Sequence, residues 1–204
     1  MNKVIALLII AICIFALSAC DTATNNTPVN NNEAEQTTTN QTEISNGETT
    51  TTGNGIVVNE IENLASAKLL AETKFVEKEE LPEDIKYLAD LGEALGLKLD
   101  FASEVYTKSD MSSEEFDTLH DYSFLYTRDD KSAKITLSKE ETPLRDYFFN
   151  TTQESSKIDG TNVVVSKFED KYIVRFNYKD INFDVETNGM SQEEMVSFVK
   201  EILK

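Results

Sequence analysis

The chain has 204 residues, and its 37 acidic and 19 basic side chains give a formal net charge of −18 at pH 7. Such a charge repels phosphate backbones and anionic headgroups, which argues against nucleic-acid binding by counterion release. Solubility near a charged surface is the more natural use of this composition.

Residues 1–19 have the pattern of a secretory signal. Lys3 precedes an apolar run from Val4 to Leu17, and small residues end that run. At about 1.5 Å per residue, a helix of this length is too short to cross a hydrocarbon core of about 30 Å comfortably. The tetrapeptide Leu17-Ser18-Ala19-Cys20 resembles the lipobox of bacterial lipoproteins. That resemblance implies cleavage before Cys20 by signal peptidase II and attachment of diacylglycerol to the Cys20 sulfur.

Lipidation at Cys20 predicts a location on the extracytoplasmic face of the cell membrane, because two or three acyl chains hold a protein there durably. Cys13 would leave with the signal and Cys20 would carry lipid, which excludes disulfides and cysteine metal sites. Cleavage also removes Lys3, so the mature chain keeps 18 basic against 37 acidic side chains. The alternatives are an uncleaved membrane anchor and an ordinary secreted protein.

Residues 20–54 comprise the lipidated cysteine and a polar stalk. Positions 21–54 contain eleven threonines and eight asparagines, with no aromatic and no basic residue. Such a segment cannot bury enough apolar area to offset the loss of chain entropy. We therefore expect a disordered linker that lifts a domain off the membrane.

Residues 55–204 have regular apolar spacing and are predicted to form a single domain. Asn59 and Glu62 have the spacing of a capping box, which predicts a first helix near residues 60–72. Pro82, a helical apolar pattern and a stop at Gly96 predict a second helix over residues 82–95. A short extended segment starts at Phe75 between them.

Beyond Gly96 the apolar period changes from helical to alternating, which predicts strands. The inward-facing sets end in polar reversals at Asp129-Asp130-Lys131, Asp159-Gly160, Glu169-Asp170 and Lys179-Asp180. Because these connections are short, the strands that they join should be antiparallel neighbours in a meander. Those strands are predicted around residues 97–101, 122–126, 133–137, 163–165, 172–178 and 181–185.

A terminal helix follows Asn188-Gly189, with a capping box formed by Ser191 and Glu194. Its apolar stripe consists of Met195, Phe198, Val199, Ile202 and Leu203. This stripe has only the sheet to cover. The predicted fold class is therefore α+β, a curved antiparallel sheet packed against helices that include the C-terminal one.

The C-terminal half, roughly residues 120–204, resembles a domain-of-unknown-function family. The residues that carry the resemblance are Tyr122-Ser-Phe-Leu-Tyr126, Ile158-Asp-Gly160, Tyr172, Ile181-Asn-Phe-Asp-Val185 and Ser191-Gln-Glu-Glu-Met195. The family occurs in extracytoplasmic parts of Gram-positive lipoproteins and anti-sigma factors. The resemblance implies an outline like that of lipoprotein carriers, in which a half-open sheet wraps a helix, and it supplies no catalytic residues.

His120 is the only histidine in the chain, and Asp117 and Asp121 lie near it. With one of the many serines, these residues outline a hydrolase constellation. No Gly-x-Ser-x-Gly element accompanies them, and a lone histidine beside acids is usually a solvated loop residue. We therefore predict no enzymatic activity and no catalytic residues.

An acidic cluster and an arginine each have both a structural and a functional interpretation. The cluster Glu79, Glu80, Glu83 and Asp84 has enough carboxylates for calcium, but its spacing matches no calcium loop, and acidic residues suit the start of a helix. Arg145 has the chemistry to receive a carboxylate ligand, although an ion pair with Asp146 or another acid is the default. We predict no metal and no cofactor.

Tyr172, Phe176, Tyr178 and Phe183 form an aromatic set that either lines a lipid-sized pocket or belongs to the core. The sequence thus leaves a non-enzymatic binding or sensing lipoprotein of unknown ligand as the first reading. A carrier of a lipid or another apolar ligand is the alternative, and a hydrolase comes last.

Overall fold

The structure is a computed structural model that describes residues 49–51, 55–110, 112–149 and 153–204. All of these belong to the second of the two units into which the chain divides, Thr42–Lys204. The predicted signal, Cys20 and most of the predicted stalk lie outside the described residues. The stalk's last described part, Thr49–Thr51, forms strand β1 against β2, so the sheet starts before the predicted boundary at Gly55.

The described elements are mostly strands, with one α-helix and two 3-10 helices. In chain order they are β1 (Thr49–Thr51), β2 (Val57–Glu60), β3 (Ala65–Ser66), β4 (Glu72–Val76), η1 (Lys78–Glu80), η2 (Lys86–Leu95), β5 (Lys98–Thr107), β6 (Thr118–Arg128), β7 (Lys131–Ser138), β8 (Tyr147–Phe148), β9 (Ser156–Ile158), β10 (Thr161–Phe168), β11 (Lys171–Tyr178), β12 (Ile181–Asn188) and α1 (Gln192–Ile202). The predicted α+β class is confirmed.

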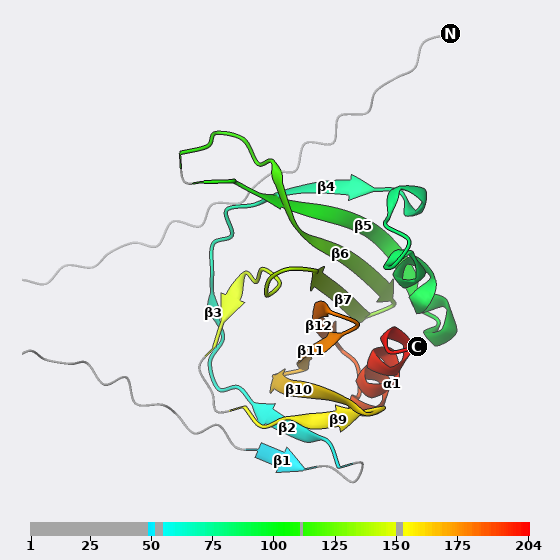
Figure 1. Cartoon of the computed structure of the whole chain (residues 1–204). Helices are drawn as coiled ribbons and strands as arrows, with labels where there is room; N and C mark the ends of the chain where they lie inside the picture. Colours follow the sequence, from blue (N-terminus) through cyan, green and yellow to red (C-terminus); the bar gives the residue numbers. More distant parts are fainter. Residues whose placement is uncertain (1–48, 52–54, 111, 150–152) are drawn as a thin grey trace, which may run out of the picture. The chain divides into compact units, whose positions relative to one another are not determined.

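Ten of the described strands form one open sheet in the order β1-β2-β10-β11-β12-β7-β6-β5-β4, and β9 also pairs with β10 (Figure 1). The predicted meander is present as the antiparallel strands β10, β11 and β12. The pairing of β2 with β10 is parallel, which the prediction of an antiparallel sheet did not include. Strands β3 and β8 form a separate two-stranded sheet.

The predicted turns set the register of the meander. Lys179 and Asp180 both have positive φ, at 51° and 61°, as a two-residue hairpin turn of type I′ requires. Asp159 and Gly160, at 46° and 87°, make the same kind of turn between β9 and β10. Short turns of fixed geometry therefore determine which residues of β11 and β12 stand opposite each other.

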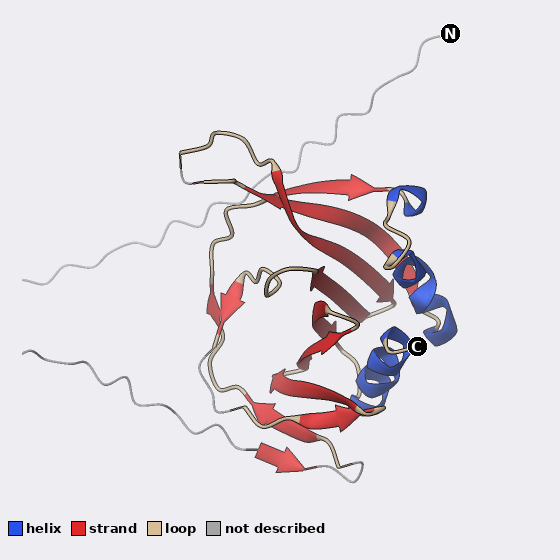
Figure 2. Cartoon of the chain, in the orientation of Figure 1, coloured by secondary structure: helices blue, strands red, loops and turns tan. Residues whose placement is uncertain are grey.

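The large sheet is covered on both faces. Val174 and Phe176 of β11 join the core cluster that contains α1, whereas Ile173, directly before Val174, packs in a smaller cluster with Ile61 and Tyr147. Figure 2 shows the helices gathered on one side of the strands and the two-stranded sheet on the other. We call these sides the helix face and the β8 face.

Helix α1 is the lid that the sequence predicts. The Ser191 backbone N–H donates to a carboxylate oxygen of Glu194 at 2.8 Å, and the Glu194 N–H donates to the Ser191 hydroxyl at 3.3 Å, which confirms the capping box. Leu203 is half-buried. The other members of the stripe have no exposed surface, namely Met195, Phe198, Val199 and Ile202. The helix thus closes the core on the helix face.

The second predicted helix is a 3-10 helix over Lys86–Leu95, shorter than the expected 82–95. It ends as predicted, because Gly96 adopts the left-handed conformation with φ 67°. Gly92 lies so close to β6 that an added Cβ would be 2.8 Å from the Leu97 carbonyl oxygen and 2.9 Å from Cδ1 of Tyr126. This contact fixes η2 against the sheet.

The first predicted helix, residues 60–72, is wrong. Asn59, taken as its cap, belongs to β2, and its side chain donates to the Val165 carbonyl of β10 at 2.8 Å. The Ile61 N–H continues this ladder to the Lys167 carbonyl at 2.8 Å. Pairing with a strand more than a hundred residues away therefore overrides the local helical spacing.

Candidate functional site

A row of polar side chains crosses the β8 face of the large sheet. Its members stand in direct register on five neighbouring strands, β5, β6, β7, β12 and β11, in the order Ser103, Ser123, Thr136, Asp184 and Arg175. Asp184 is 3% exposed, and the two serines and the threonine are also buried. Buried polar groups need hydrogen-bond partners, so this row of side chains is the candidate functional site.

Asp184 is held by the segment of residues 139–149, which crosses the β8 face. The Arg145 Nε donates to Oδ2 of Asp184, and the Tyr147 hydroxyl donates to Oδ1 at 3.2 Å. Burial raises the pKa of Tyr147, and the Asp184 charge adds to this, so the phenol stays protonated as a donor. Both carboxylate oxygens of Asp184 are therefore occupied by this segment.

Arg175 stands directly opposite Asp184 and yet lacks a partner for two of its nitrogens. Its Nε and Nη2 are buried and have no hydrogen bond among the described residues. The ring of Phe149 lies over the guanidinium, with 5.1 Å from its centroid to Cζ. Burial lowers the pKa of Arg175, and the nearby Arg145 charge lowers it further. A guanidinium stays charged in proteins, so the β8 face holds a positive charge with unsatisfied donors.

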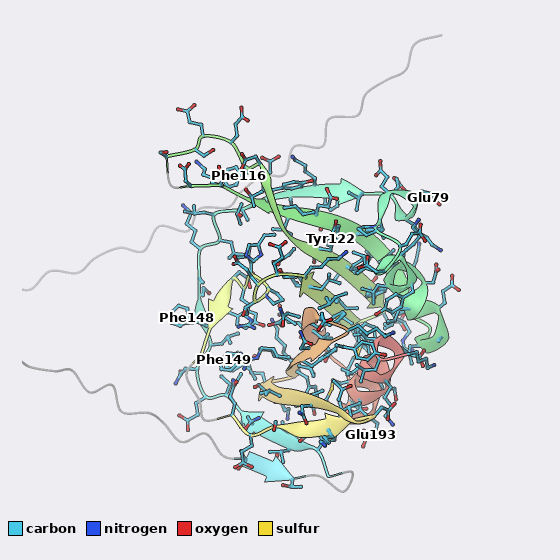
Figure 3. The ribbon with its side chains drawn as sticks, viewed as in Figure 1. Glu79, Phe116, Tyr122, Phe148, Phe149 and Glu193 are labelled. Carbon is cyan, nitrogen blue, oxygen red and sulfur yellow. The ribbon has the colours of Figure 1, made fainter. Side chains whose placement is uncertain are left out.

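A cavity of about 360 Å³ adjoins this guanidinium. Its walls come from the 139–149 segment, from strands β10 to β12 and from Gln153, and include Thr142, Pro143, Arg145, Val164, Arg175 and Asn182. Figure 3 shows Phe148 of β8 and the adjacent Phe149 away from Glu193 at the start of α1. Two of the three arginines in the sequence thus line one cavity on the β8 face, which we call the arginine pocket.

His120 lies in strand β6 and is half-buried, not in a solvated loop. Its Nδ1 is 2.7 Å from a carboxylate oxygen of Asp121, and its Nε2 is 3.2 Å from one of Glu141. The Ser138 hydroxyl donates to the His120 backbone carbonyl at 3.0 Å and not to the ring. Asp117 lies elsewhere, accepting from a loop N–H. A histidine with carboxylates at both nitrogens has no contact with a serine nucleophile to activate.

The His120 pair also fastens the 139–149 segment to the sheet. Burial lowers the pKa of His120, but the hydrogen bonds and charges of Asp121 and Glu141 outweigh it, so the pKa lies above its usual value. The second oxygen of Asp121 accepts from the Leu144 N–H at 2.8 Å. The segment that carries Arg145 is therefore tied to β6 at His120 and at Asp121.

Three of the acidic residues at 79–84 are divided among separate contacts. Glu83 pairs with Lys86 at 2.5 Å, and Asp84 pairs with Lys139 at 2.7 Å. Glu80 caps η1 through the Glu77 N–H at 3.0 Å. Within residues 49–51, 55–110, 112–149 and 153–204, no group of three or more acidic, histidine or cysteine side chains is placed to hold a metal ion.

The aromatic set belongs to the core of the helix face. The rings of Phe176 and Phe183 stack with 5.0 Å between centroids, and Tyr172 is also buried. The Tyr178 hydroxyl donates to the Leu203 carbonyl at 2.7 Å, which ties the sheet to the end of α1. These side chains pack with α1 in one hydrophobic cluster.

Sequence reasoning named Arg145 but missed Arg175 and Asp184. The expected ion pair of Arg145 is made with Asp184, not with the adjacent Asp146. The signal for the other two was available, because a two-residue turn at Lys179-Asp180 places Arg175 opposite Asp184 on the outward positions of the predicted strands.

The lipidation site Cys20 lies outside the described residues. In the part of the chain that the structure describes, no helix is both long enough and apolar enough to cross a membrane. No family model, curated protein or solved structure matches the chain.

Proposed function

We propose that this protein is a lipid-anchored, extracytoplasmic binding module for a small anionic ligand and that it is not an enzyme. The observation that carries the proposal is the guanidinium of Arg175 beside a cavity of about 360 Å³, with its buried Nε and Nη2 left without a partner among the described residues. A buried donor without a partner costs free energy, roughly 1–3 kcal/mol or more for a charged group. In folded proteins, buried donors without a partner are found mainly at binding sites, where a ligand can satisfy them.

The anchor part of the proposal rests on the lipobox Leu17-Ser18-Ala19-Cys20. The non-enzymatic part is supported by the geometry at His120, whose ring nitrogens face Asp121 and Glu141 and not a hydroxyl. A carrier of apolar ligands is less well supported, because the aromatic side chains that would line its pocket belong with the apolar side chains of α1 to one hydrophobic cluster.

Membrane fractionation tests the anchor. In the producing bacterium, Cys20→Ser should move the protein from the membrane fraction to the soluble fraction. A Ser18→Thr variant, which keeps a small polar side chain and the cysteine, is the matched control and should stay with the membranes. Sedimentation of Cys20→Ser with the membranes would place the anchor elsewhere.

Thermal unfolding of the full chain in detergent tests anion binding. Sodium acetate, phosphate and sulfate are compared with sodium chloride at equal ionic strength, because a ligand that binds only the folded state raises the melting temperature. At least one of the three anions should stabilise the protein relative to chloride. Equal melting temperatures in all four salts would contradict the binding function.

A further inference from the structure

The two unpartnered atoms of Arg175 lie on one edge of its guanidinium. The Nε–H and one Nη2–H point the same way, and their spacing matches the two oxygens of a carboxylate or two oxygens of a phosphate. Both atoms are buried without a partner, whereas the side chain itself lines the arginine pocket. An oxyanion that displaces the side chains covering this edge would therefore meet both donors of a two-point contact.

The charges around the pocket favour a single negative charge on the ligand. Arg145 and Arg175 contribute two positive charges and Asp184 one negative charge, so the cluster has one uncompensated positive charge. A carboxylate neutralises it, whereas a phosphate dianion would leave a negative charge in a chain whose net charge is already −18. Asp121 lies close enough to Asp184 to interact with its charge. The Asp121 charge is offset by His120 at 2.7 Å when the imidazole is protonated, and Asp121 and Glu141 favour that form by raising the pKa of the histidine.

The cavity is larger than a carboxylate group. About 360 Å³ exceeds by roughly tenfold the 30 Å³ share of one water molecule in the liquid, which leaves room for a ligand with a body beyond its charged group. Pro143 and Val164 offer apolar wall, and Thr142 and Gln153 offer polar atoms. Phe149 over the guanidinium keeps the plane of Arg175 fixed before the ligand arrives.

We propose that the arginine pocket binds the carboxylate of a small organic acid through the Nε and Nη2 edge of Arg175, with Arg145 held close by Asp184 as a second positive charge. This inference rests on the proposed anion-binding function and names its ligand class. The ligand's carboxylate supplies the acceptors that Asp184, already occupied by Arg145 and Tyr147, does not.

The chain has three arginines, which makes a direct test possible. Nuclear magnetic resonance of the nitrogen-15-labelled full chain in detergent resolves the three Nε–H signals, and the variants Arg128→Lys and Arg145→Lys identify the Arg175 signal by elimination. This assignment leaves Arg175 itself unchanged. The probes are sodium acetate, sodium propionate and inorganic phosphate, each titrated against chloride at equal ionic strength.

The Arg175 Nε–H signal should move and saturate with acetate and propionate, at lower concentration than with phosphate. Arg175→Lys, which keeps the charge but not the two-point edge, should weaken binding by about tenfold or more, measured by the same propionate titration through a backbone signal. Arg128→Lys is the matched control. Arg128 contacts Glu194 and the Leu95 carbonyl in a different part of the fold, so this variant should bind like the wild type.

Each contrary outcome has a separate meaning. Tighter binding of phosphate than of either carboxylate at the Arg175 signal overturns the ligand class but keeps the anion-binding function. Carboxylate binding that leaves the Arg175 signal in place, or that Arg175→Lys does not weaken, overturns the assignment to this pocket. Absence of any response to all three probes removes the inference together with the proposed function.

Discussion

Replacement of Phe198 by alanine tests whether α1 is a structural lid on the sheet. Phe198 has no exposed surface, and its ring meets that of Tyr126 edge to face with 5.6 Å between centroids. The Tyr126 hydroxyl in turn donates to the Leu88 carbonyl of η2. One aromatic side chain thus joins α1, strand β6 and the 3-10 helix, and its loss should loosen all three together.

The expected cost follows from this burial. Truncation of a fully buried phenylalanine to alanine removes its transfer free energy and leaves a cavity, together about 3–5 kcal/mol. That is a large share of the roughly 5–15 kcal/mol that holds a typical domain folded. For a domain of this size, we expect the melting temperature to fall by about 6–20 °C.

The assay is thermal unfolding of the full chain in detergent, followed by circular dichroism. Phe148→Ala is the matched control, because it makes the same chemical change at a side chain that is 63% exposed. Its melting temperature should stay close to that of the wild type. If the melting temperature of Phe198→Ala equals that of Phe148→Ala, α1 is a detachable element and the lid interpretation is wrong.

Two further predictions concern the contacts that hold the 139–149 segment and η2. Because the folded pKa of His120 lies above its usual value, its contribution to stability is complete at pH values below about 6.5 and is lost as the pH rises through the folded pKa. His120→Gln should therefore destabilise the protein more at about pH 5.5 than at about pH 8.5 in urea unfolding, and a pH-independent difference would contradict the charged contact. Gly92→Ala should cost about 1–3 kcal/mol, because its Cβ would meet the Leu97 carbonyl oxygen at 2.8 Å. Glu93→Ala, exposed on the same 3-10 helix, is the control, and equal stability of both variants would refute the close packing.

The helix predicted at residues 60–72 shows where local patterns fail. Asn59 and Glu62 have capping-box spacing, but the Asn59 amide is used by the Val165 and Glu154 carbonyls, which lie about a hundred residues along the chain. No window of sequence contains both partners. Apolar spacing within a window of sequence therefore could not predict the parallel pairing of β2 with β10, which lies near one edge of the sheet.

The sequence by itself determined the elements whose contacts are local. Period-two alternation and two-residue turns gave β10, β11 and β12 with their register, and a capping box with a helical stripe gave α1. The same register already places Arg175 opposite Asp184. What only the tertiary structure decided is that Arg145, 39 residues before Asp184, takes that carboxylate. The partner of a charged side chain depends on which groups lie near it in space, and a buried side chain cannot hydrogen-bond to water instead. The Nε and Nη2 of Arg175 are therefore left without a partner, which no local sequence pattern predicts.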